Sequence, residues 1–241
     1  MRTGVGHDRP PLTRQRIVDV SLGLLDKDGT SGFSLPKLGR ALGADPTAIY
    51  RHFASKDDLT LAIADRLIEE ATTGMTPGPC WLGTLSEMAR RLRTTYRSHP
   101  AAASLSSFRT TQQPAEMKAA DIVVGAVLEA GFEAPQAAVI FQAIADFGLA
   151  WAGLDALFLA LDKRLQIKDR SAWISAYLTV KEADFPNLWQ VRHELPEVDE
   201  DHAFEAILSL LLAGLQLQAP VPCHCAVHAG ESTGVDESGS D

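Results

Sequence analysis

Three side chains near residue 50 have chemical types suited to nucleic-acid recognition, and they share one helical face. Thr47, Tyr50 and Arg51 follow the i, i+3, i+4 spacing of a helix. They carry a hydroxyl with a methyl group, a phenol and a guanidinium, which can read base edges or hold phosphates. Ile49 and Phe53 lie at i, i+4 on the other side and should face the core. The pattern predicts a DNA-reading face, while Tyr50 also suits a packing role with its hydroxyl at the surface.

A second group of polar residues interrupts the longest apolar segment, residues 135–161. Gln142 and Asp146 lie one helical turn apart there, and a buried carboxylate needs a partner. The pair is suited to binding a ligand, to hydrogen-bonding its neighbours or to meeting a second protomer, and the sequence leaves all three open. Other residues expected to line a ligand cavity are Arg93, Arg97, His99, Phe108, Arg109, Gln112 and Trp151. They indicate no ligand class beyond a mild preference for an apolar, aromatic-containing compound.

The C-terminal tail contains Cys223, His224, Cys225 and His228, whose side chains are able to hold zinc or copper. They lie between Pro-Val-Pro and a run rich in Gly, Ser and Asp, so we expect a disordered tail over residues 220–241 and no metal site. The chain has no glycine-rich phosphate loop, no Gly-x-Ser-x-Gly and no His-Glu-x-x-His. We therefore expect neither an enzyme nor a bound cofactor.

The helices that must position the DNA-reading face have clear ends. A first helix is predicted from Thr13, a suitable N-cap, to Lys27, with Gly29 just beyond its end. A second helix is predicted to open at Ser34 and stop at Gly43. Leu38, Ala41 and Leu42 should form its buried face.

The segment Gly43-Ala44-Asp45-Pro46 predicts that a third helix starts almost at once. Asp45 is a good N-cap, and Pro46 fits the first helical position because no backbone N–H is needed there. So tight a turn forces the two helices to cross steeply, which is the helix-turn-helix arrangement. Ser55 and Asp58 have the spacing of a capping box that opens a fourth helix.

These residues resemble the DNA-binding domain of the TetR family over about residues 12–71. The resemblance is carried by Leu35-x-x-Leu38-x-x-Ala41-Leu42-Gly43, Thr47-Ala48-Ile49-Tyr50-Arg51-His52-Phe53 and Lys56-x-x-Leu59. It implies that Thr47, Tyr50 and Arg51 contact the operator, and that His52 and Lys56 hold phosphates. It also implies that Lys37 contacts the DNA backbone. His52 would equally suit a structural role within the protein. Leu35 and Pro36 stand where many members have a polar, DNA-facing pair, which favours less readout by the second helix.

Beyond residues 74–79 the chain reads as helices without a convincing strand. We expect helices over 81–98, 101–108, 114–129, 135–161 and 199–218, with one or two irregular helices within 162–198. Two of these segments, 135–161 and 199–218, have more apolar surface than the single stripe with which a helix usually packs on its own core. Their layout is similar to the TetR dimer interface of four helices. The fold class expected is all-α, with a three-helix N-terminal helix-turn-helix domain and a larger helical bundle that holds the ligand pocket.

Charge is divided unevenly along this 241-residue chain. Residues 1–56 hold nine Lys and Arg against five Asp, a net charge of +4. Because the whole chain has a net charge of −9, residues 57–241 carry −13. A basic module on an acidic body suits phosphate contacts by one part of the chain only. We expect an arm over residues 1–11, the helix-turn-helix domain over 12–56, a ligand-sensing and dimerisation domain over 57–219, and the tail.

The function favoured by these features is a repressor that a small molecule releases from a palindromic, double-stranded operator. The alternative is a helical protein-interaction adaptor with a vestigial DNA module. Acidic residues or Pro220 interrupt each apolar stretch before the ~18 residues that a membrane span needs, and residues 1–10 have no apolar signal core. Three cysteines make no disulfide framework in such a chain. We therefore expect a cytoplasmic protein with no membrane partner.

Overall fold

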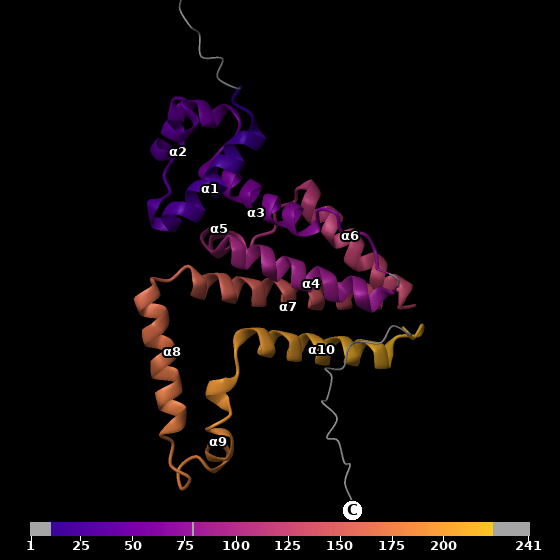
Figure 1. The fold of residues 1–241 in the computed structure, drawn as a ribbon. Helices are drawn as coiled ribbons and strands as arrows, with labels where there is room; N and C mark the ends of the chain where they lie inside the picture. The colour runs from indigo at the N-terminus through magenta and orange to yellow at the C-terminus, as the bar shows by residue number, and fades with distance from the viewer. Residues whose placement is uncertain (1–10, 79, 224–241) are drawn as a thin grey trace, which may run out of the picture.

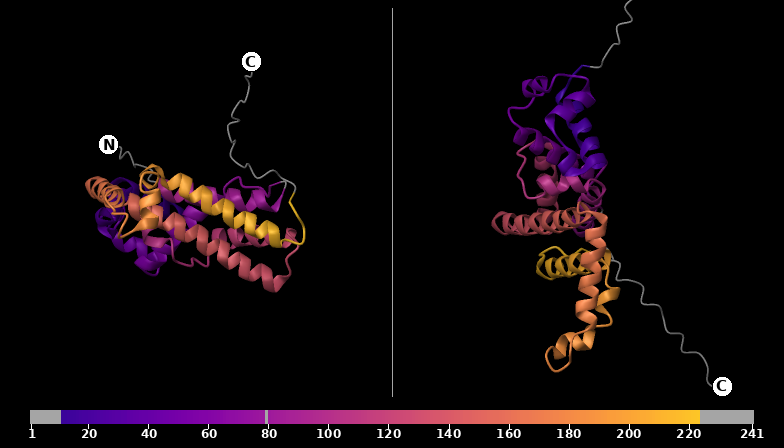
Figure 2. Two further views of the ribbon diagram at one scale, coloured as in Figure 1. Left: turned by 90° about the horizontal axis from the view of Figure 1, so that it is seen from below. Right: turned by 90° about the vertical axis from the view of Figure 1, so that its left-hand side faces the viewer.

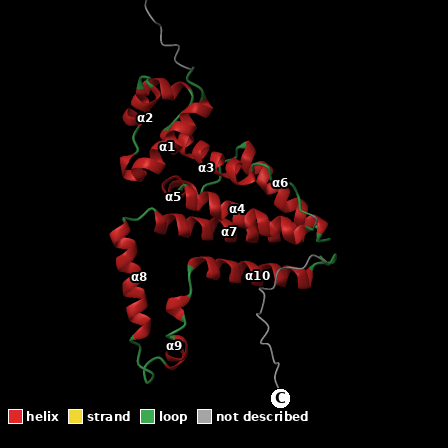
Figure 3. Ribbon diagram, in the orientation of Figure 1, coloured by secondary structure: helices red, strands yellow, loops and turns green. Residues whose placement is uncertain are grey.

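The protein is built of helices throughout the part that the structure describes. This computed structural model describes residues 11–78 and 80–223, and within those ranges no strand occurs (Figure 3). The regular elements are α1 (Arg14–Gly32), α2 (Leu35–Leu42), the 3-10 helix η1 (Pro46–Arg51), α3 (Lys56–Thr72), α4 (Trp81–Ser98), α5 (Pro100–Ser106), α6 (Pro114–Glu129), α7 (Ala134–Leu159), α8 (Lys163–Leu178), α9 (Pro186–Val191), the 3-10 helix η2 (Leu195–Glu197) and α10 (Glu200–Gln218). The all-α expectation is confirmed.

The N-terminal part follows its predicted caps closely. The Thr13 hydroxyl accepts a hydrogen bond from the Arg16 N–H, and the Ser34 hydroxyl accepts one from the Lys37 N–H. Gly29 has a φ of 68° and interrupts α1, after which a short helical turn runs on to Gly32. The predicted burial of Ala41 is wrong: α2 buries Leu38, Gly39 and Leu42, and Ala41 is exposed.

The helix α3 connects the N-terminal helices with the rest of the molecule (Figure 1). Its buried Leu59, Ile63 and Leu67 belong to a hydrophobic core that α1, α2 and η1 also enter. The same core includes Tyr96 of α4 and Ala152 of α7. Apolar packing is therefore continuous from the helix-turn-helix into the body, so motion of α3 is felt on both sides.

A second hydrophobic core lies in the body, between α4, α6, α7 and α10. Phe147 and Trp151 of α7 both contact Phe204 of α10, with ring centroids 6.2 and 6.0 Å apart. The two helices lie side by side in both orientations (Figures 1 and 2). The predicted helices at 81–98 and 114–129 have those bounds in the structure, and 135–161 is α7 to within two residues.

The helix α7 is, among the described residues, the one helix long and apolar enough to cross a bilayer by length and composition. The expectation that acidic residues break every such stretch is wrong for it. Only 22% of its most apolar window is buried within this chain. The core helices of soluble proteins pass the same test.

The segment after α7 forms an arm that extends away from the body (Figures 1 and 2). Irregular helices were expected over residues 162–198, but α8 is regular for 16 residues and is capped by Asp162. The predicted tail also begins too early. Residues 220–223 pack on the body: the Val221 N–H donates to the Ala130 carbonyl at 2.9 Å, and Cys223 is buried. His224, Cys225 and His228 lie outside the described residues.

Candidate DNA interface and effector cavity

The turn between α2 and η1 is held by two glycines and one cap. Gly43 ends α2 in the left-handed region, with a φ of 65°. The Asp45 carboxylate accepts the Thr47 N–H at 2.8 Å and starts η1. A Cβ on Gly39 would come within 2.9 Å of the Pro46 ring. Gly39, which the sequence analysis did not single out, therefore lets α2 approach the turn closely.

The predicted DNA-reading face lies on the outside of η1. Tyr50 is 52% exposed and Thr47 and Arg51 are exposed, whereas Ile49 and Phe53 are each 1% exposed. The helix has 3-10 geometry in place of the expected α-helix, so Thr47 and Tyr50 lie directly above one another, three residues apart. Among the described residues, the side chains of Tyr50 and Arg51 have no hydrogen bond or ion pair, and they are available to a partner.

Thr47 is held by its own cap. Its hydroxyl donates to the Asp45 carboxylate at 2.6 Å, which leaves its methyl group and an oxygen lone pair facing outwards. The hydroxyl and the backbone N–H of Thr47 lower the pKa of Asp45 below its usual range, with a smaller contribution from Arg51. The capping carboxylate is thus ionised at neutral pH and fixes the orientation of the first exposed side chain of η1.

The three residues that the family resemblance links to phosphates differ in their surroundings. Lys56 is exposed in the first turn of α3 and has no ion pair in the described ranges; His52 is half-buried at the C-cap of η1. Lys37 is already paired, because its Nζ lies 2.8 Å from the Asp28 carboxylate. A phosphate would compete with Asp28 for Lys37, whereas it would meet Lys56 unopposed.

Arg14, which the sequence analysis left out, holds the end of η1 in place together with Asp58. The Arg14 guanidinium lies 4.2 Å from the centre of the Phe53 ring and donates to the His52 carbonyl at 2.9 Å. It also bonds Asp58 at 3.0 Å, which lowers the pKa of that carboxyl. Asp58 takes part in the predicted cap: the Ser55 hydroxyl accepts its N–H, and its carboxylate accepts the N–H of Ala54. The α1 helix thus fixes the junction of η1 and α3.

The body contains an apolar cavity of about 420 Å³ between α3, α4, α6 and α7. A ligand pocket in this helical bundle was expected, but none of the residues that line this cavity was predicted, because they also read as ordinary core. Its lining is Ile68, Ala71, Thr72, Met88, Ala89, Leu92, Glu116, Met117, Ala119, Ala120, Val123, Phe141, Ile144, Ala145, Gly148 and Leu149. Its one ionisable lining residue is Glu116. Burial and the charge of Glu116 together raise the pKa of Tyr96 nearby.

A wider hollow of about 670 Å³ adjoins this cavity between the loop after α5, α6 and α7, and we call it the mouth. The mouth shares Glu116, Phe141, Ala145 and Leu149 with the cavity. Four of the predicted ligand residues, Phe108, Arg109, Gln142 and Asp146, line the mouth. Asp146 is exposed rather than buried, and the Gln142 amide donates to it at 2.8 Å.

Arg93 and Arg97, also predicted to line the cavity, lie elsewhere. Arg93 is buried and bonds the buried Asp155 at 2.6 Å, with its guanidinium 4.5 Å from the centre of the Phe204 ring. Arg97 bonds Asp155 at 3.1 Å, and both arginines reach Asp201. This network ties α4, α7 and α10 together, and neither arginine lines the cavity or the mouth.

The remaining predicted ligand residues occupy three separate places. The His99 ring lies between Asp26 of α1 and Glu70 of α3, at 2.9 and 3.2 Å, and so links three helices. Gln112 is exposed and has a φ of 55°, the one positive value outside glycine in the described ranges. The Trp151 indole N–H is buried between α7 and α10, and no described residue accepts a hydrogen bond from it.

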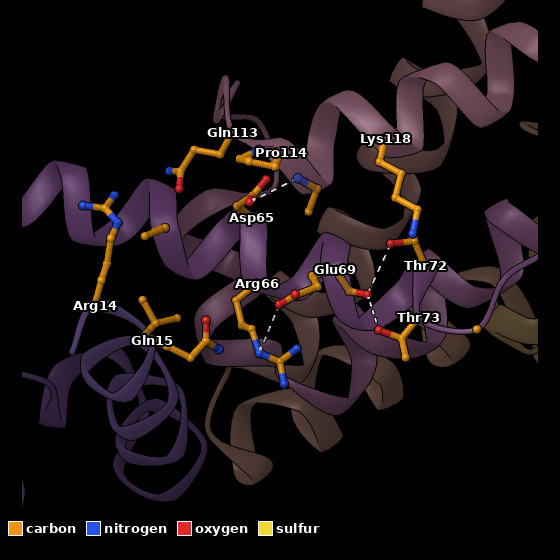
Figure 4. Close-up of a pocket in the computed structure, with 14 residues that line it drawn as sticks. Arg14, Gln15, Asp65, Arg66, Glu69, Thr72, Thr73, Gln113, Pro114 and Lys118 are labelled. Carbon is orange, nitrogen blue, oxygen red and sulfur yellow. Dashed lines mark hydrogen bonds and ion pairs between the residues drawn. The ribbon is translucent and has the colours of Figure 1, made fainter. Parts of the chain in front are cut away.

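A third hollow lies on the seam between α1, α3 and α6 (Figure 4). Its charges are largely paired within the chain: Arg66 contacts Asp19, Glu69 and Glu70. The Asp65 carboxylate accepts the first N–H groups of α6, those of Ala115 and Glu116. These contacts join the N-terminal helices to the body.

The loop over residues 107–113 joins the mouth to α3. Arg109 forms two hydrogen bonds to Asp57, at 2.8 and 2.9 Å, in the first turn of α3 beside Lys56. This contact lowers the pKa of Asp57. The Thr111 hydroxyl lies 3.1 Å from Asp65 and 2.6 Å from Glu116. The loop therefore touches the cavity at one end and the helix that carries Lys56 at the other.

Comparison with known families matches most of the chain to two models. Residues 17–63 match bacterial regulatory proteins of the tetR family, and residues 75–219 match the tetracyclin repressor-like C-terminal domain. The second match alone spans more than half of the chain. Both matches agree with the helix-turn-helix geometry and with the layout of the helical body.

Individual proteins show the same similarity. An HTH-type transcriptional regulator of Saccharopolyspora erythraea is 29% identical over 180 residues, which is 75% of each chain. The class C tetracycline repressor protein of Escherichia coli is 26% identical and covers 85% of this chain and 91% of its own. The crystal structure of ActR from Streptomyces coelicolor, a TetR family protein in complex with (S)-DNPA, has a TM-score of 0.73 at 25% identity, covering 87% of this chain and all of its own.

Proposed function

Because this chain belongs to the tetracycline repressor family, it is a ligand-responsive, DNA-binding transcriptional regulator, and we propose that it is a repressor released from a palindromic operator by a small effector. The observation that carries the proposal is the outer face of η1. The side chains of Tyr50 and Arg51 project from it with no hydrogen bond or ion pair to any described residue, and Lys56, beside it, has no ion pair in the described ranges. Tyr50 and Arg51 lie on the second helix of the helix-turn-helix, the position from which such modules contact base edges.

The DNA contacts proposed are divided by chemistry. Thr47, Tyr50 and Arg51 lie on η1 and suit base edges in the major groove. His52, Lys56 and, after release from Asp28, Lys37 suit the phosphates that fix the position of the protein on the duplex. These residues fall within or beside the proposed DNA-binding domain, residues 12–56, and the body over residues 57–219 senses the effector.

A homodimer accounts for the apolar faces that one chain leaves uncovered. Val139 of α7 is 70% exposed, and Leu210 and Leu217 of α10 are 70 and 89% exposed. Helices with this much exposed apolar surface need a partner. We assign the interface to α7 and α10, which would make four helices across a two-fold axis. Such an arrangement places a protein in water, and the cytoplasm, where the operator is, is the compartment proposed.

The effector is proposed to occupy the apolar cavity and its mouth. A ligand there would press on Glu116 and the 107–113 loop, which bonds α3 at Asp57 and at Asp65. Movement of α3 would shift η1 and change the spacing of the two DNA-reading faces in the dimer. The operator affinity would then fall by the ratio of the effector's affinities for the two states.

The test of DNA binding uses the DNA immediately upstream of the gene, titrated with the full-length protein at several salt concentrations. We expect sequence-preferring binding with a steep salt dependence. Lys56→Ala should weaken binding to all sequences and reduce the salt slope by about 1 per protomer, or about 2 per dimer. Lys163→Ala, at the exposed start of α8, is the matched control and should change neither. Absent or salt-insensitive binding by the wild type would favour the adaptor.

A further inference from the structure

The mouth of the effector cavity carries two carboxylates that no cation in the described ranges neutralises. Glu116 and Asp146 both line it, and neither takes part in an ion pair there. The one cation in the lining is Arg109, and both of its terminal nitrogens are engaged by Asp57. The mouth therefore keeps an uncompensated negative charge beside an apolar space.

Each of the two carboxylates also has one oxygen to spare. All three hydrogen bonds to Glu116 end on Oε2: they come from the Thr111 N–H and hydroxyl and from the Gln112 N–H. No described group bonds Oε1. Asp146 uses Oδ1 for the Gln142 amide, and no described group bonds its Oδ2. The first oxygen of each group is committed to the fold, and the second is open to a ligand.

The apolar cavity beside the mouth determines the chemistry of the part of the ligand that would be buried in it. Its walls are aliphatic and aromatic side chains such as Met88, Leu92 and Phe141, and Glu116 stands at the boundary with the mouth. An apolar group is stabilised there by burial, while a polar group would lose its hydration. The two spaces are contiguous, because four residues line both.

We infer that the effector is an amphipathic cation, with an apolar, ring-sized body in the cavity and a protonated amine in the mouth, bound by Glu116 and Asp146. This inference rests on the proposed function, because it names the chemical class of the effector that the same cavity takes. Binding of the amine to Glu116 would act on the group that holds Thr111 and Gln112, and through them on the loop bonded to α3.

The test compares three probes that share a ring and differ in charge: naphthylethylamine, naphthylethanol and naphthylacetate. Each is titrated calorimetrically into the full-length protein at neutral pH. We expect the amine to bind about tenfold more tightly than the alcohol, because a charge-assisted hydrogen bond forms in a partly desolvated site, and the acid to bind most weakly.

Two variants examine the carboxylates separately. Asp146→Asn should bring the ratio of the amine's affinity to the alcohol's affinity towards one, and it should leave the hydrogen bonds of the 107–113 loop unchanged. Glu116→Gln should do the same and keeps an amide oxygen for the three loop hydrogen bonds; its melting temperature shows whether the loop survives. Asp121→Asn, an exposed residue on α6 that lines neither space, is the control of equal charge and should keep the full ratio.

The results separate the ligand class from the regulator function. Equal affinity for amine and alcohol, preference for the acid, or no saturable binding of any probe overturns the amphipathic cation, even while operator binding stands. Loss of the ratio in the Asp121→Asn control also overturns it, because the preference would then come from net charge alone. An amine preference without operator binding would instead refute the repressor while leaving the ligand class intact.

Discussion

The helix-turn-helix and the effector body hold their polar residues in opposite ways. At η1 the caps are made within three residues along the chain, and Tyr50 and Arg51 are left facing solvent. In the body, polar groups are paired over long distances, as in the contact of Arg93 with Asp155, 62 residues away. The surface proposed to bind DNA keeps its donors free, whereas the body pairs its buried charges. The mouth of the cavity, with Glu116 and Asp146 outside any ion pair in the described ranges, departs from this pattern.

The largest effect is expected where the body depends on its buried charge. Asp155→Ala leaves Arg93 buried with only the exposed Asp201 as an anionic partner, and should lower the free energy of unfolding by about 3–5 kcal/mol. Chemical denaturation of the two proteins measures this difference. Glu205→Ala breaks a pair with Arg90 that is about half exposed, and should cost less than about 1 kcal/mol. Equal losses in both variants would contradict the contrast between buried and surface pairs.

The next effect is expected at the turn of the helix-turn-helix. Gly39→Ala places a methyl group 2.9 Å from Pro46 and 3.0 Å from the Ala44 carbonyl, so α2 must move away from the turn. We expect a loss of about 1–3 kcal/mol in stability and a larger proportional loss of operator affinity. Gly23→Ala, in α1 with open space around it, should be neutral or stabilising by up to about 1 kcal/mol. Unaltered operator binding by Gly39→Ala would show that the close approach is not needed.

The helix-turn-helix was the more predictable of the two regions, because its stabilising contacts join residues that are close together in the sequence. Thr13, Ser34, Asp45 and Ser55 each cap a helix by bonding an N–H two or three residues later, so spacing along the sequence was enough to find them. The 3-10 geometry of η1 was not found, because helical periodicity over six residues does not separate it from an α-helix.

The residues that line the cavity could not be predicted by the same means. Arg93, Arg97 and His99 were grouped with the mouth because they are polar and lie near it in sequence, but their partners Asp155, Asp26 and Glu70 come from other helices. Nothing local distinguishes an arginine that crosses the core from one that faces a ligand. Gln142 and Asp146 do lie at the mouth, yet the burial that drew attention to them is absent.

The smallest effect is expected at the junction of η1 and α3, and it depends on pH. Arg14 lowers the pKa of Asp58 in the folded state, so this contact adds stability above the ordinary carboxyl pKa of about 3.9. The contribution is lost as the pH falls through the lowered value. The melting temperature of Asp58→Asn should therefore lie below that of the wild type by a constant amount at neutral pH, and the gap should close below about pH 4. A gap that widens in acid would contradict the assigned ion pair.

The most direct test of the central claim is a hydroxyl-radical footprint of the full-length protein on the DNA upstream of its gene. A dimer joined through α7 and α10 presents two η1 faces, each in a major groove. The account predicts two protected half-sites with two-fold symmetry, about 34–36 Å or a whole multiple of one helical turn apart. Protection should be lost in Arg51→Ala at salt concentrations where Arg164→Ala, on exposed α8, still protects. A single protected patch, or protection unaffected by Arg51→Ala, would contradict it.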